Sequence, residues 1–179
     1  MNRRLLLILP ILAGCADFTA PDPVRLPRDS VEGAGDPTRA AVARSAYVFA
    51  RPVALTGHPG EAARAIADME FLAAALPFDP RYQQRDPLLP QQLALARAEW
   101  RAVLGIAPGQ PAQPVIDGLY AVARASAEGK PLRLAGGSFG AGSLTRLEDL
   151  PPLPQTARAA AAASRVQTES QFPIGRRRF

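Results

Sequence analysis

Residues 89–105 read LPQQLALARAEWRAVLG, and this segment indicates the fold more directly than any other. Its apolar residues recur at alternating spacings of four and three, which places their side chains on one face of an α-helix. These residues are Leu89, Leu93, Ala96, Trp100 and Val103. Pro90 suits the first turn of a helix, and Gly105 suits its end. The segment predicts an amphipathic helix with Trp100 in the core, while Arg97 and Arg101 fall on other faces.

Four further segments, residues 37–50, 59–76, 114–129 and 154–168, also begin at a proline and predict helices. The strongest apolar stripe among them contains Ala62, Ile66, Met69, Ala73 and Leu76. Tyr47, Phe71 and Tyr120 lie in helical segments, which favours core positions over a ligand groove. We expect an all-α fold, a small bundle or orthogonal array of four to five helices over residues 37–168. An array of helical repeats is an alternative, although the segments share only their apolar period.

The composition argues against most metal-dependent chemistry. The chain of 179 residues has one histidine, one cysteine and, among its 21 basic residues, a single lysine. One histidine and one cysteine cannot form an intramolecular nitrogen and sulfur metal site. The sequence has neither a calcium-loop pattern nor a phosphate-binding glycine loop that ends in lysine. We therefore predict no metal and no cofactor. With no second cysteine there is no intramolecular disulfide, so stability must come from the core.

The N-terminus, MNRRLLLILPILAGC, has the layout of a signal peptide: Arg3 and Arg4, an apolar run over residues 5–12, then small residues. The run is much shorter than the roughly 20 residues that span a bilayer. Removing residues 1–14 would take away two arginines and no acid. The remaining 19 basic and 16 acidic residues would lower the formal charge from +5 to +3.

Leu12-Ala13-Gly14-Cys15 resembles the lipobox of bacterial lipoproteins at all four positions. The resemblance implies cleavage between Gly14 and Cys15 and lipidation of Cys15, so that the mature protein is anchored by several acyl chains. Ala16 follows the cysteine, where aspartate would resemble an inner-membrane retention signal, so the outer membrane is favoured over the inner. The general secretory route is preferred to twin-arginine export. The alternative is an ordinary secreted protein with a cysteine near the cleavage site by chance.

Two segments lack a helical pattern. Residues 15–36 contain scattered prolines and glycines, which predicts a lipidated cysteine followed by a flexible tether that holds the domain about 25 Å from the lipid. Residues 169–179 predict a basic flexible tail, with Arg176, Arg177 and Arg178 near its end. These arginines either contact lipid phosphates or anionic polymers, or remain solvated.

The stretch Gly136-Gly137-Ser138-Phe139-Gly140 matches the pattern G-x-S-x-G of serine hydrolases. In such enzymes the serine follows a strand, and an acid and a histidine come later in the chain. Residues 132–135 could just form that strand, but the single histidine, His58, lies upstream of the serine. A hydrolase would need a fold that brings His58 to Ser138, with Asp149 or Asp117 orienting it. The sequence favours a glycine-rich loop, with no catalytic residues assigned.

Two other candidate groups also have simpler explanations. His58 precedes Pro59 at the start of a predicted helix, which favours a role at the helix N-terminus or simple exposure. Glu148 and Asp149 are adjacent in sequence, and adjacency does not bring two carboxylates to one substrate bond. They favour a solvated helix boundary over an acid–base pair.

Together these features predict a non-catalytic lipoprotein that faces the periplasm and acts as a binding or scaffolding module. Its expected partners are the membrane, through the lipid anchor, and an envelope protein or peptidoglycan. Nucleic acid is not expected, because export removes the protein from the cytoplasm. The alternatives are a small envelope hydrolase that uses Ser138 and a purely structural protein associated with peptidoglycan.

Overall fold

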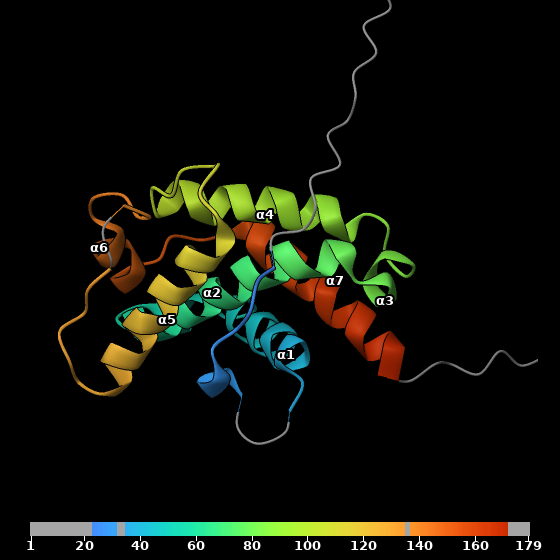
Figure 1. Ribbon diagram of the computed structural model, residues 1–179, viewed down its shortest axis with the longest axis horizontal. Helices are drawn as coiled ribbons and strands as arrows, with labels where there is room; N and C mark the ends of the chain where they lie inside the picture. The colour runs from blue at the N-terminus through green and yellow to red at the C-terminus, as the bar shows by residue number, and fades with distance from the viewer. Residues whose placement is uncertain (1–22, 32–34, 135–136, 172–179) are drawn as a thin grey trace, which may run out of the picture.

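The computed structural model describes residues 23–31, 35–134 and 137–171, and these residues form an all-α fold without a strand (Figure 1). The helices are α1 (Pro37–Phe49), α2 (Pro59–Ala75), α3 (Pro80–Gln83), α4 (Leu89–Val103), α5 (Ala112–Ala127), α6 (Ser143–Glu148) and α7 (Pro154–Gln171). Three 3₁₀ turns, η1 (Arg28–Ser30), η2 (Pro52–Leu55) and η3 (Leu76–Phe78), connect them. The five predicted helices are all present. The sequence analysis missed the two short helices, α3 and α6.

Helix α2 is the centre of the packing, because α1, α4, α5 and α6 all contact it. Its most extensive contact is with α5, and α7 crosses the far side of the array against α1 and α4. Helix α4 runs along one edge of the molecule (Figure 1). The predicted stripe residue Trp100 is fully buried, as are Leu93 and Ala96. The core position predicted for Trp100 is confirmed.

Local sequence explains where the helices begin and end. The Asp36 carboxylate accepts hydrogen bonds from the amides of Thr38 and Arg39 at 2.9 and 3.4 Å, which caps α1 ahead of Pro37. Gly105 adopts a φ of 60° after α4, and the Ile106 amide donates to the Arg101 carbonyl at 2.8 Å. This is a Schellman ending, for which glycine suits the left-handed position.

Small residues permit close packing at two places. A side chain at Gly60 of α2 would collide with Cβ of Ser126 on α5, so glycine is required where these helices meet. At Gly118 of α5, the ring of Phe139 from the α5–α6 connection packs directly on the glycine and leaves no room for a side chain. The alanines of α7 at positions 159, 160, 162 and 163 are buried, which lets this helix lie close to α1 and α4.

Part of the segment predicted to be a flexible tether, residues 15–36, packs against the domain. Val24 and Leu26 pack against the hydrophobic core, Ser30 is buried, and the Arg25 amide donates to the Gln113 side chain at 2.8 Å. The apolar contacts of Val24 and Leu26 explain the difference. At the other end, α7 continues to Gln171 rather than ending at about Thr168. The signal segment 1–14, Cys15 and the tail arginines lie outside the described residues.

Tyr47 was expected in the core, but 66% of it is exposed. The Arg51 guanidinium lies 4.8 Å from the centre of its ring, an arrangement typical of a cation–π contact at the surface. Val42 and Phe49 form the buried face of α1. Tyr47 lies on the opposite face of the helix and is therefore exposed to solvent. Phe71 and Tyr120 are buried as expected.

Candidate functional site

Two buried carboxylates lie at the centre of the fold, Asp68 and Glu70 of α2. Side chains two residues apart on a helix point in nearly opposite directions, at 100° per residue. Asp68 therefore faces α1 and α5, while Glu70 faces α4. Both carboxylates are fully inaccessible to solvent, so each needs partners within the protein.

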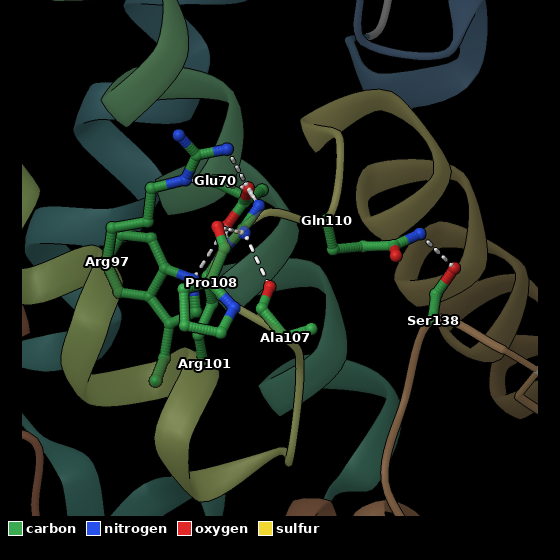
Figure 2. A network of polar contacts seen from close by, with 8 residues as sticks. Glu70, Arg97, Arg101, Ala107, Pro108, Gln110 and Ser138 are labelled. Atoms are coloured by element: carbon green, nitrogen blue, oxygen red, sulfur yellow. Dashed lines mark hydrogen bonds and ion pairs between the residues drawn. The ribbon is translucent and has the colours of Figure 1, made fainter.

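Glu70 joins α2 to α4 through three side chains (Figure 2). One of its oxygens accepts from Arg97 Nε and Nη2 at 2.9 and 2.7 Å and from Arg101 Nη2. The other oxygen accepts from Trp100 Nε1 at 2.8 Å and from Arg101 Nε at 3.2 Å. Arg101 also donates to the carbonyls of Ala107 and Pro108, which fixes the loop after α4. The prediction that Arg101 lies away from the core is wrong, because Glu70 provides a buried partner.

The charges around Glu70 keep it ionised. Burial opposes ionisation, but hydrogen bonds from Arg101 and Arg97 and their positive charges outweigh it, and they hold the pKa of Glu70 below its ordinary value. Two guanidinium groups face one carboxylate, so the cluster carries one net positive charge. That charge lies close to the surface, because 30% of the Arg97 side chain is exposed.

Asp68 joins α2 to α1 and α5. Arg44 donates to both of its oxygens at 2.6 and 3.0 Å, and the Tyr120 hydroxyl donates to one of them at 2.6 Å. Burial raises the pKa of Tyr120, and the negative charge of Asp68 raises it further. Arg44 and Arg64 also donate to the Ser30 carbonyl at 3.2 and 3.0 Å. The same network therefore attaches η1 to the helices.

A mostly apolar groove of about 360 Å³ lies above the Glu70 cluster. It is lined by Ala94, Arg97, Ala98, Arg101, Ala102, Ile106 and Pro108. Its walls come from the outer side of α4 and from the loop that follows, while the guanidinium groups provide its only charged lining. Such a groove suits an apolar group that carries a negative charge.

Ser138, the serine of the G-x-S-x-G match, lies in the connection between α5 and α6. Its Oγ accepts a hydrogen bond from Gln110 Nε2 at 2.9 Å, and Figure 2 shows this pair to one side of the Glu70 cluster. An amide donor cannot remove a proton from the hydroxyl. Residues 132–134 form neither a strand nor a helix, and Gly136 lies outside the described residues.

The remaining candidates come from two segments that meet, because the Gly57 amide before α2 donates to the Glu148 carbonyl at the end of α6 at 2.8 Å. His58 is at the N-cap position of α2 and is exposed, and its side chain makes no capping hydrogen bond. Glu148 and Asp149 are both exposed at the end of α6, as expected for a solvated boundary. Within the described ranges, no group of three or more His, Cys, Asp or Glu side chains is placed to hold a metal ion. Gly14 and Cys15 are outside those ranges.

The sequence analysis missed both buried carboxylates. A signal was present, because Asp68 and Glu70 alternate with Ala67, Met69 and Phe71 in an apolar helix. Acids in that setting need cationic partners. The identity of those partners depends on which helices pack against α2, which the sequence pattern does not give.

None of the helices in the described part of the chain combines the length and hydropathy needed to cross a membrane. Comparisons with known protein families, with curated proteins and with solved structures found no match for this chain.

Proposed function

We propose that this protein is a lipid-anchored component of the bacterial cell envelope whose helical domain is a non-catalytic binding or scaffolding module. The observation that carries the proposal is the sequence Leu12-Ala13-Gly14-Cys15 at the end of an apolar segment that follows two arginines. The thiol of Cys15 is the only one in the chain, and it is the nucleophile that would accept a diacylglyceryl group. Ala16 favours the outer membrane, with the domain facing the periplasm.

The use of charge inside the domain supports a non-catalytic role. Asp68 and Glu70 hold helices together through arginine, tyrosine and tryptophan partners, so neither offers a free carboxylate for acid–base chemistry. Ser138 is paired with an amide rather than a base. What remains accessible is a surface with apolar and cationic character, which suits binding.

Intact-mass measurement of protein extracted from membranes tests the anchor. We expect the loss of residues 1–14 and an added mass that corresponds to acylation of Cys15. The Cys15→Ala variant should keep the unmodified full mass and should not be acylated. An unmodified, soluble wild-type protein would refute the anchoring proposal.

Two competing functions have separate tests. A hydrolase that uses Ser138 would react with a serine-directed phosphonate, and Ser138→Ala would abolish the labelling. We expect no labelling of the folded wild-type protein. A wall-associated structural protein would cosediment with purified peptidoglycan. Crosslinking in intact cells, followed by mass spectrometry, would identify a protein partner instead.

A further inference from the structure

The solvent-facing side of α4 carries several exposed apolar residues around the exposed Gln91. Leu88 and Leu95 are 60% and 53% exposed, and they lie seven residues apart, so they share one helix face. Ala94, Ala98 and Ala102 are exposed beside them. We call this set of five residues the α4 face. It extends over the full length of a helix that forms one edge of the molecule (Figure 1).

Arginines border the α4 face on both sides. On one side lies the groove lined by Arg97, which is partly exposed, with the buried Arg101 beneath it. On the other lies a second groove of about 350 Å³ between α4 and α7, where Arg158 and Arg165 stand beside Leu95. Within the described residues, no acid lines either groove.

Among the nearby acids, Asp86 lies at one end of the α4 face, where its carboxylate accepts from the Leu88 amide at 3.0 Å, and two others are engaged away from the face. Glu99 of α4 accepts from the amides of Gln155 and Thr156 at 3.1 and 2.9 Å, so it caps the start of α7. Glu70 is buried beneath Arg97 and Arg101. The surface therefore combines an apolar ridge with positive charge on both flanks, the pattern of helices that lie in the interface of an anionic bilayer.

We propose that the α4 face, with Arg158 and Arg165, docks on the anionic surface of a lipid bilayer and holds α4 parallel to it. The inference rests on the proposed lipid anchor, which would keep the bilayer permanently within reach. Tethering converts docking into an intramolecular step, so a weakly binding surface is sufficient.

The chain length and its point of entry are compatible with this arrangement. Cys15 and Pro23 are eight positions apart, which allows a reach of at most about 28 Å. Arg25 is hydrogen-bonded to Gln113 at the start of α5, directly after the loop whose Pro108 lines the α4 groove. The chain therefore enters the domain beside the proposed docking surface and need not cross the molecule to reach it.

A single-thiol reporter tests the proposal in the lipidated protein. Acylation occupies the Cys15 thiol, so Leu95→Cys supplies the only free thiol for a polarity-sensitive fluorophore. The matched control is Ala43→Cys on α1, which is also exposed and lies on the other side of α2 from α4 (Figure 1). Both proteins are reconstituted into vesicles of phosphatidylcholine alone or mixed in equal parts with phosphatidylglycerol. Nitroxide lipids in the same vesicles quench any label that lies at the bilayer surface.

We expect strong quenching of the Leu95→Cys label on the mixed vesicles, reversed by high salt, and little quenching of the control label. Arg158→Glu with Arg165→Glu should weaken docking at least about tenfold, since each basic residue near an anionic surface contributes about fivefold. Arg39→Glu with Arg133→Glu, which changes two exposed arginines elsewhere, should leave it unchanged.

Failure of the docking proposal is distinct from failure of the anchor. If Cys15 is acylated and the vesicles carry the protein, but the Leu95→Cys label stays in water, docking is refuted and the anchor stands. If the Leu95→Cys label is shielded from water in intact cells but not on lipid vesicles, the α4 face binds a protein and the bilayer proposal is wrong. If mass measurement shows an unmodified Cys15, the anchor fails. Docking is then decided with Cys15→Ser protein, in which salt-sensitive quenching at position 95 still supports the surface.

Discussion

The buried Glu70 cluster makes the sharpest stability prediction. Glu70→Gln keeps the size of the side chain but removes its charge, and it leaves the nearly buried Arg101 guanidinium without a counter-ion. Removing one partner of a buried ion pair costs about 3 to 5 kcal/mol, a large share of the roughly 5 to 15 kcal/mol that stabilises a domain. At about 2 to 4 °C per kcal/mol for a protein of this size, the thermal midpoint should fall by about 6 to 20 °C.

The effect should depend on pH in a defined direction. The pKa of Glu70 is lowered in the folded protein from an ordinary value of 4.5, so ionised Glu70 stabilises the fold above about pH 4.5. As the pH falls through the lower folded-state pKa, wild-type protein takes up a proton at Glu70 and loses this contribution. Glutamine does not titrate. The stability difference between wild type and Glu70→Gln should therefore be largest near neutral pH and should narrow in acid.

Urea unfolding followed by circular dichroism, at pH 7 and at several values below 4.5, measures both effects. Glu128→Gln is the matched control, because Glu128 pairs with Lys130 at an exposed position, where solvent screens the pair and its loss should change stability little. A second variant, Glu70→Gln with Arg101→Met, removes the uncompensated cation and should recover part of the loss. A Glu70→Gln protein within about 1 kcal/mol of wild type at pH 7 would show that the reasoning about buried charge is wrong.

Three further predictions concern packing and the loop serine. Trp100→Ala should lower the free energy of unfolding by about 3 to 5 kcal/mol, because the ring is fully buried. An unchanged melting temperature together with loss of partner binding would mean that the ring belongs to a binding surface. Gly60→Ala should destabilise by about 1 to 3 kcal/mol through its collision with Ser126, and Ser126→Gly should restore stability in the double variant. Gly109→Ala, at a position with open space, is the control, and a larger loss there would contradict the collision argument. Ser138→Ala should lower the free energy of unfolding by less than about 1.5 kcal/mol, since it removes one hydrogen bond to Gln110. A larger loss of stability, measured by calorimetry, would mean that the loop has a structural role.

Prediction from sequence succeeded where local rules dominate. A proline at the start of a helix and an apolar spacing of three and four are properties of a short segment, and they were sufficient to locate α1, α2, α4, α5 and α7. They were insufficient for α3 and α6, because four and six residues are too few to show a helical period. The exposure of Tyr47 was missed for a related reason. An apolar residue near a stripe is buried only if a neighbouring helix covers that side.

The sequence by itself determined the helical class, the helix starts at Pro37, Pro59 and Pro154, the burial of Trp100 and the absence of a second cysteine for a disulfide; α5 begins at Ala112 rather than at the predicted Pro114. Only the tertiary structure decided that Asp68 pairs with Arg44 and Tyr120, and that Glu70 pairs with Arg97 and Arg101. These partners are separated from the carboxylates by between 24 and 52 residues. A periodic pattern reports which side of a helix avoids water, whereas a buried ion pair depends on which two helices meet and at what rotation. For that physical reason the ion pairs of Asp68 and Glu70 could be identified only from the packing of the neighbouring helices around α2.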